Sequence, residues 1–303
     1  MISFKDITKE FKPDFWKPSF LALDSLSFNI PEGCITGFLG ANGAGKTTSL
    51  KILMNFINTN SGEVEYSRAL GSTWNEIVSN IGFLPERPYF YPHLTGLEFI
   101  HYMGDLCGVK RSTIAERSAK WGERFKIRFA FDRKIRGYSK GMLQRLGYVI
   151  SLIHDPQLVI FDEPLSGLDP VGRKELKDAM REINDLGKTV FFSSHIISDV
   201  EEVCDQVIFI EKGKLVYQGQ IDQLIKSKMK SEVLFKVKCS PEKLTAIGID
   251  SFAGIGDGKF KFTTLTIDQN KTIRNLLASE ISILELSPKR PTLEEVIYKV
   301  GEF

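Results

Sequence analysis

Short apolar runs alternate along most of the chain with longer stretches in which apolar positions recur at helical spacing. A buried strand is typically a short continuous apolar run, whereas an amphipathic helix repeats apolar residues every three or four positions. We therefore expect strands at residues 1–11, 20–30, 35–39, 63–66, 81–84, 158–161, 189–193, 206–210 and 215–217. We expect helices at 46–57, 95–107, 113–125 and 171–186, one ending near residue 154, and a short one before residue 206. This alternation is typical of an α/β domain.

The pattern changes near residue 228, where a lysine-rich segment at 226–230 indicates a domain boundary. Beyond it the apolar pattern predicts a strand at 232–238, a helix at 241–247, strands at 250–254 and 259–264, a helix at 268–279, a strand at 282–286 and a last helix from Thr292. The order β-α-β-β-α-β is that of a ferredoxin-like α+β domain. We expect two domains, at residues 1–228 and 229–303.

Charge and hydropathy narrow the possible functions. Lys and Arg total 40 against 38 Asp and Glu, so the formal charge of +2 gives no reason to expect a nucleic-acid partner. No apolar run approaches the roughly 18 to 20 residues that span a bilayer, and charges in the first eight positions disfavour a secretory signal. If the protein acts at a membrane, another subunit must cross it.

The cysteines indicate a reducing compartment. Cys34, Cys107, Cys204 and Cys239 lie far apart in the sequence, with neither a zinc-binding spacing nor a disulfide framework. A cytoplasmic location is the simplest setting.

A phosphate-binding motif follows the strand predicted at 35–39. The segment Gly40-Ala-Asn-Gly43-Ala-Gly45-Lys46-Thr47 fits G-x-x-x-x-G-K-[ST] and stands between a strand and a helix. Its glycines let backbone N–H groups surround phosphate oxygens, Lys46 reaches the β and γ phosphates, and Thr47 can bind Mg²⁺. We predict ATP contacts from Gly40, Asn42, Gly43, Ala44, Gly45, Lys46, Thr47 and Thr48.

Two carboxylates, Asp162 and Glu163, follow the strand at 158–161. In an open parallel sheet, ligands bind at this edge. We expect Asp162 to organise Mg²⁺ and Glu163 to orient and deprotonate the water that attacks the γ phosphorus. One such carboxylate alone would be an ordinary acidic turn, but the upstream phosphate loop favours the paired role.

Further segments, in order, resemble the motifs of ATP-binding cassette (ABC) transporter nucleotide-binding subunits. Tyr138-Ser139-Lys140-Gly141-Met142 resembles the family signature L-S-G-G-Q, although only Ser139 and Gly141 match cleanly. Ser166-Gly167-Leu168-Asp169 resembles the D-loop, and His195 occupies the position of the switch histidine. The resemblance covers roughly residues 1–228, and the segment 287–297 resembles the tail of bacterial export cassettes.

The resemblance implies a fold and a site. The expected fold is a P-loop NTPase cassette with a mixed sheet core, an antiparallel β subdomain and a helical subdomain at about 87–155. Glu86 stands where the family usually has a glutamine that ligates Mg²⁺, and it could instead pair with Arg87. Phe11 is the expected adenine-stacking ring; Phe15, Trp16 or another ring within residues 15–20 could replace it, or Phe11 could be a core residue.

The resemblance also implies partners. Two such domains close head to tail, so Ser139, Gly141 and Asp169 would contact the ATP bound by a second nucleotide-binding subunit, identical or similar. The expected cofactors are ATP and Mg²⁺. Separate transmembrane permease subunits would be driven from the cytoplasmic side, with the chain peripheral on the inner face of the cell membrane. The segment from Arg87 to about Cys107 is the expected docking site, because it begins right after Glu86 and has three aromatic rings at 89–91, which could instead pack into the core of the helical subdomain.

Two rival functions are less favoured. A soluble ABC ATPase acting on nucleic acid or ribosomes typically carries two cassettes, a long coiled coil or zinc-binding cysteines, and the sequence has none of these. A non-hydrolysing regulatory cassette is disfavoured because both Glu163 and His195 are present.

Overall fold

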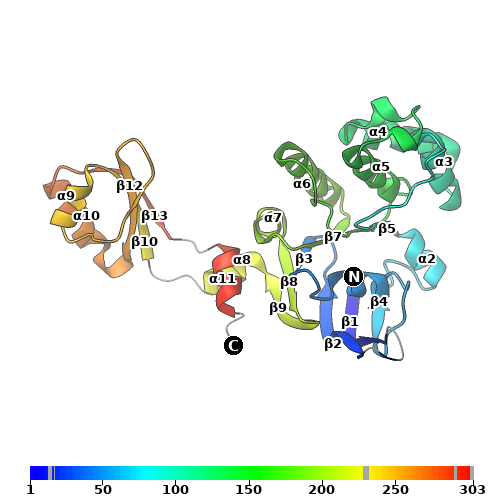
Figure 1. The fold of residues 1–303 in the computed structure, drawn as a ribbon, viewed down its shortest axis with the longest axis horizontal. Helices are drawn as coiled ribbons and strands as arrows, with labels where there is room; N and C mark the ends of the chain where they lie inside the picture. The colour runs from blue at the N-terminus through cyan, green and yellow to red at the C-terminus, as the bar shows by residue number, and fades with distance from the viewer. Residues whose placement is uncertain (13–15, 17, 228–231, 290–291, 301–303) are drawn as a thin grey trace. The chain divides into compact units, whose positions relative to one another are not determined.

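The structure is a computed structural model that describes residues 1–12, 16, 18–227, 232–289 and 292–300. It divides into two compact units, Met1–Ile221 and Asp222–Phe303 (Figure 1). The division follows Ile221, the first residue of helix α8 (Ile221–Ser227), whereas the sequence placed the boundary after residue 228. Each unit is described by itself.

A six-stranded sheet forms the centre of the first unit. Its strands, in spatial order, are β5 (Ile81–Leu84), β6 (Leu158–Phe161), β7 (Thr189–Ser194), β3 (Ile35–Leu39), β8 (Gln206–Glu211) and β9 (Lys214–Gln220). All neighbours are parallel except β8 and β9, which are antiparallel. Strands β3, β6 and β7 are buried along their whole length, as expected for a parallel sheet covered on both faces.

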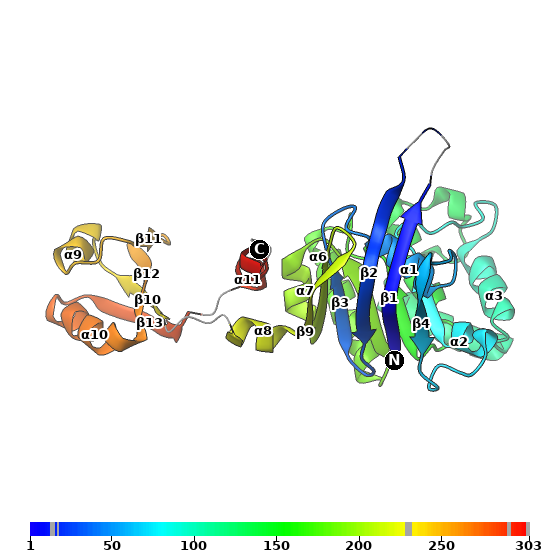
Figure 2. The ribbon, with the colours of Figure 1, turned by 90° about the horizontal axis from the view of Figure 1, so that it is seen from below.

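A second sheet of three antiparallel strands packs against the first. It has the order β2 (Phe20–Ile30), β1 (Ile2–Phe11) and β4 (Ser61–Tyr66) (Figure 2). Aromatic rings join the two sheets: the ring centroid of Phe28 on β2 lies 5.4 Å from that of Phe38 on β3 and 6.5 Å from that of Phe191 on β7. One hydrophobic core therefore holds the phosphate-loop strand β3 against the second sheet.

Helices surround these sheets. They are α1 (Lys46–Leu53), α2 (Trp74–Ser79), α3 (Gly96–Leu106), α4 (Arg111–Arg124), α5 (Lys140–Leu152), α6 (Pro170–Asp185) and α7 (Ile197–Val203). Figure 1 shows α3, α4 and α5 clustered together, and all three lie in the chain between β5 and β6. Two 3₁₀ turns, Arg128–Ala130 and Ile135–Gly137, complete this helical region.

The second unit has its own core. Its elements are β10 (Glu232–Lys238), α9 (Pro241–Ala246), β11 (Ala253–Gly254), β12 (Lys259–Leu265), a 3₁₀ turn (Thr266–Asp268), α10 (Gln269–Ala278), β13 (Ser282–Pro288) and α11 (Leu293–Val300). The strands form one antiparallel sheet in the order β11-β12-β10-β13. Phe235, Phe262, Leu244 and Leu276 are buried between the sheet and helices α9 and α10. The predicted fold class is confirmed.

Within the described ranges, no helix is both long enough and apolar enough to cross a bilayer.

Candidate active site

The phosphate loop occupies the turn between β3 and α1. Gly43 and Gly45 have φ angles of +83° and +108°, which other L-residues rarely adopt. A Cβ at Gly45 would also lie 2.6 Å from Leu23 Cδ2, and one at Gly40 would lie 2.7 Å from the Ile210 carbonyl oxygen. The curvature of the loop therefore favours glycine at positions 43 and 45, and close packing requires it at positions 40 and 45.

A pocket of about 450 Å³ opens over this loop. It is lined by Phe20, Ala22, Ala41, Asn42, Gly43, Gly45, Lys46, Thr47, Thr48, Glu86, Glu163, Ser166 and His195. Of the residues predicted to contact ATP from this loop, only Gly40 and Ala44 do not line the pocket. The sequence did not select Ala22, Ala41 or Ser166.

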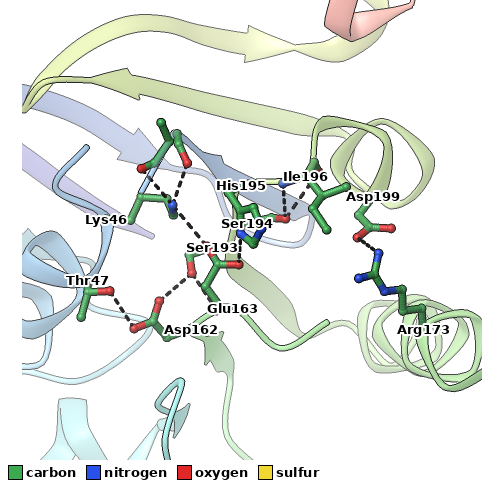
Figure 3. A network of polar contacts seen from close by, with 12 residues as sticks. Lys46, Thr47, Asp162, Glu163, Arg173, Ser193, Ser194, His195, Ile196 and Asp199 are labelled. Carbon is green, nitrogen blue, oxygen red and sulfur yellow. Dashed lines mark hydrogen bonds and ion pairs between the residues drawn. The ribbon is translucent and has the colours of Figure 1, made fainter. Parts of the chain in front are cut away.

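Lys46 is the buried cation of the pocket (Figure 3). Its Nζ donates a hydrogen bond to the Gly40 carbonyl oxygen at 2.7 Å and lies 3.2 Å from Glu163 Oε1. A buried ammonium group needs anionic or carbonyl partners, because burial alone disfavours its charge. The loop thus aims a positive group at the place where phosphate would bind.

Asp162 and Thr47 bring hard oxygen atoms together at the end of β6. Thr47 Oγ1 donates to Asp162 Oδ2 at 3.2 Å, and Ser193 Oγ donates to Asp162 Oδ1 at 2.6 Å. Burial raises the pKa of the Asp162 carboxyl, against the opposing effect of these two hydrogen bonds. A hydroxyl and a carboxylate at this spacing, with Glu86 lining the same pocket, fit the ligand preference of Mg²⁺.

Glu163 is fixed by its backbone conformation and by contacts to two residues of the chain segment 193–195. Its φ of +48° lies in the left-handed region, which is strained for a non-glycine residue. Its backbone N–H donates to Ser193 Oγ at 2.8 Å, and its Oε2 lies 2.9 Å from His195 Nδ1. The Ser193 hydroxyl therefore positions both carboxylates, one by accepting and one by donating a hydrogen bond.

The sequence analysis missed Ser193. Its position near the end of an apolar strand can be seen in the sequence, but its place next to the acidic pair depends on β7 lying beside β6.

The residues predicted to act across a dimer lie outside this pocket. Ser139 caps the N-terminus of α5 and accepts a hydrogen bond from the Met142 N–H at 3.3 Å. Gly141 has open space where a Cβ would lie. Asp169 caps α6 and accepts from the Gly172 N–H at 2.9 Å. None of the three lines the chain's own pocket.

Phe20, rather than Phe11, is the ring on the pocket wall. The two are cross-strand partners in β1 and β2, but Phe11 does not line the pocket, and Lys9 Nζ lies 5.1 Å from its ring centroid. Phe20 does line it and is 58% exposed. Of the alternatives, Trp16 is exposed and does not line the pocket, and Phe15 lies outside the described residues.

Glu86 lies near Arg87 and also lines the pocket, so its contact to a metal ion stays a prediction. It lines the pocket, and its Oε1 lies 3.9 Å from Arg87 Nε in an exposed contact. Such a long, solvated ion pair contributes little, so it does not compete strongly with a metal ion for the carboxylate.

Sequence comparison settles the family. The family model described as ABC transporter matches residues 23–166. The ABC transporter ATP-binding protein YhaQ of Bacillus subtilis is 32% identical over 307 residues, covering 99% of this chain and 99% of the relative. The chain belongs to the ABC transporter ATP-binding proteins.

Other members of the ABC family are similar over shorter or comparable lengths. An ABC transporter ATP-binding protein of Nostoc sp. is 38% identical over 233 residues, which are 75% of this chain and 68% of the relative. The bacitracin transport ATP-binding protein BcrA of Bacillus licheniformis is 31% identical over 291 residues, 92% of each chain. As a member of this family, the chain is an ATP-binding ATPase that powers transport.

Solved ABC structures share the fold of the first unit. A structure described as the ATP binding subunit of an ABC transporter has a TM-score of 0.66 at 24% identity, covering 75% of this chain and 92% of that chain. A cassette in a dimeric post-hydrolysis state bound to ADP and phosphate has a TM-score of 0.64 at 23% identity. The match covers 73% of this chain and 99% of that chain.

Proposed function

We propose that this ABC cassette works as one half of a dimer that closes around ATP and drives separate membrane-spanning subunits, in the export direction. The observation that carries the proposal is that the chain's predicted ATP contacts lie in two separate places. Lys46, Glu163 and His195 gather at one pocket, whereas Ser139 lies at the N-terminus of another helix, outside that pocket. A helix N-terminus favours an anion, so Ser139 needs a nucleotide held by a second subunit.

A solved relative supports the dimer. The cassette bound to ADP and phosphate is described as dimeric. In a head-to-tail dimer of this chain, Ser139, Gly141 and Asp169 of one subunit would complete the pocket of the other. The partner is a second copy or a similar cassette.

The chain's own residues suggest how hydrolysis proceeds. Lys46 binds the β and γ phosphates, and the phosphate oxygens compete with Glu163 for its ammonium group. Glu163, still oriented by His195, then accepts a proton from the attacking water. Thr47, Asp162 and Glu86 would hold Mg²⁺, which would neutralise negative charge on the phosphates.

The export direction and the membrane location rest on relatives and chemistry. The bacitracin transport protein BcrA is similar along 92% of the chain, and the tail at 287–297 resembles that of bacterial export cassettes. ATP is a cytoplasmic substrate, so the cassette would act peripherally on the inner face of the membrane. Residues 1–228 would form the cassette and residues 229–303 an accessory domain.

The substitution Glu163→Gln tests the proposal. It removes the base but retains the phosphate cradle, so ATP binding should persist while turnover falls by about 100-fold or more. With Mg²⁺ and ATP, the variant should elute as a dimer in size-exclusion chromatography with light scattering. Glu116→Gln, an exposed change on α4, should hydrolyse ATP normally and stay in the state of the unmodified chain. Normal turnover in Glu163→Gln, or a monomer with bound ATP, would contradict the proposal.

A further inference from the structure

Helices α9 and α10 lie on one face of the sheet of the second unit, where they close its hydrophobic core (Figure 1). Val233, Phe235 and Val237 of β10 are buried in this core. Because side chains alternate along a strand, Lys236 and Lys238 point to the opposite face.

Four lysines form a block on that opposite face. Lys236 pairs directly with Lys261 of β12, and Lys238 pairs directly with Lys259. Directly opposed residues of an antiparallel pair share a face, with Cβ atoms about 4.5–5.5 Å apart. We call Lys236, Lys238, Lys259 and Lys261 the lysine block. Strands β10 and β12 are the two central strands, so the block lies in the middle of the sheet.

Only half of this charge is neutralised within the unit. Lys236 Nζ lies 2.6 Å from Glu285 Oε2, and Lys259 Nζ lies 3.8 Å from the exposed Asp257 carboxylate. Among the residues that the structure describes, no ion pair involves Lys238 or Lys261, and both are exposed. Like charges placed directly opposite one another destabilise a sheet, so an anionic partner would relieve this repulsion.

The chemistry of the face limits the partner. The aromatic rings of the two central strands point to the core, where Phe235 and Phe262 stack with centroids 5.1 Å apart. The block therefore has no ring on which a nucleic-acid base could stack. A second copy of the same face would meet it with equal positive charge. A lysine ammonium group is a point charge on a flexible stem and lacks the planar, bidentate geometry of an arginine. Four lysines therefore suit a layer of phosphate groups better than a single ligand of defined shape.

We propose that the lysine block binds the phosphate headgroups of an acidic lipid bilayer. The inference rests on the proposed function, which places the chain beside a membrane. With a formal charge of only +2 for the whole chain, the attraction arises from clustering on one face and not from bulk charge. The accessory domain thereby gains a second attachment to the membrane, independent of the permease.

Vesicle co-sedimentation of the full chain tests this. The unmodified protein should bind vesicles of phosphatidylcholine mixed with phosphatidylglycerol, should not bind phosphatidylcholine alone, and should release as salt rises. Lys238→Gln with Lys261→Gln should weaken binding at least tenfold. Lys243→Gln with Lys271→Gln, a matched loss of two charges on α9 and α10, should leave it within twofold. Lys238→Arg with Lys261→Arg should bind like the unmodified chain.

The alternatives give different results. Equal loss in both glutamine variants would indicate bulk charge and overturn the proposal, as would failure of the unmodified chain to bind acidic vesicles. Tighter binding to duplex DNA or single-stranded RNA than to vesicles would identify a nucleic-acid surface instead. ATP turnover, measured on the same preparations, separates this from the proposed function: normal turnover without vesicle binding overturns the lipid contact alone.

Discussion

The Asp199 carboxylate on α7 lies 2.8 Å from the Lys177 ammonium group on α6, and both side chains are buried. Arg173 of α6 approaches the other Asp199 oxygen at 3.5 Å (Figure 3). Helix α6 begins at the cap residue Asp169, and α7 begins two residues after His195. This buried ion pair therefore connects the helix that follows the D-loop to the helix that follows the switch histidine.

We predict that Asp199→Asn loosens this connection. Lys177 keeps its contact to Glu202, so the free energy of unfolding should fall by only about 1–3 kcal/mol. Misplacing His195 should lower kcat by about tenfold or more, with the KM for ATP nearly unchanged. Thermal unfolding and steady-state kinetics measure both effects. Asp178→Asn, which breaks an exposed pair on the same α6, is the matched control. An unchanged kcat in Asp199→Asn would show that the ion pair is purely structural.

A second prediction concerns Asp162 and pH. Burial raises the pKa of this carboxyl in the folded state, so the folded protein binds the proton more tightly than the unfolded chain does. The free energy of unfolding therefore falls as pH rises through the folded-state pKa. Asp162→Asn should therefore unfold at a higher temperature than the nucleotide-free unmodified chain at neutral pH. The difference should vanish below the unfolded pKa of about 3.9. Melting curves across pH test this, with the exposed Asp132→Asn as control. A less stable Asp162→Asn at neutral pH would contradict it.

The sequence predicted the elements around the site closely, for physical reasons. The strands at 35–39 and 158–161 match β3 and β6 residue for residue, because short apolar runs bounded by glycine, proline or acidic residues leave little choice of boundary. The helix predicted at 46–57 ends at Leu53 instead, since Asn55 adopts a φ of +54°. Helix α2 was missed, although the capping box formed by Thr73 and Glu76 was readable.

The side-chain geometry of the site was less predictable. Which of two cross-strand rings, Phe11 or Phe20, faces the pocket depends on strand register and bulges, and β1 pairs with β2 through several register shifts. The role of Ser193 depends on β6 and β7 being neighbours, a tertiary fact that local spacing does not contain.

The ring on the pocket wall gives a third prediction. If Phe20 stacks on adenine, Phe20→Ala should raise the Kd for ATP by about tenfold or more, since base–aromatic stacking contributes about 1–3 kcal/mol. Phe11→Ala should change the Kd by less than twofold, because its ring does not line the pocket. Isothermal titration calorimetry of both variants measures this. A larger effect at Phe11 would restore the choice made from sequence.

Glu86 supplies the fourth prediction. If its carboxylate ligates Mg²⁺, Glu86→Gln should remain active, because an amide oxygen also ligates the ion. Glu86→Ala should require more Mg²⁺ for half-maximal hydrolysis. Arg87→Ala removes only the 3.9 Å ion pair and should leave the Mg²⁺ titration unchanged. If Arg87→Ala shifts the titration as much as Glu86→Ala does, the ion pair and not the metal contact determines the behaviour.

The aromatic segment after Glu86 leads to the last prediction, on docking of the membrane subunit. Tyr89 is 80% exposed and forms an edge contact with Tyr91, whereas Phe90 is only 8% exposed and packs on Phe99. Phe90 therefore lies in the core and Tyr89 at the surface, whereas Tyr91 is 38% exposed and packs on Phe99 and Tyr102. Exposed aromatic side chains are favoured anchors for a partner.

Replacing Tyr89 and Tyr91 with Ser should therefore spare the ATPase activity of the isolated chain and abolish co-purification with the membrane subunit. Phe129→Ser, at another exposed ring in the helical region, should leave co-purification intact. Phe90→Ala should instead destabilise the fold by about 3–5 kcal/mol, as expected for a buried ring. If the double Tyr variant unfolds, these rings belong to the core; if it keeps both properties, the membrane subunit docks elsewhere. Loss of co-purification with unchanged turnover and melting temperature would leave the surface formed by Tyr89 and Tyr91 as the contact.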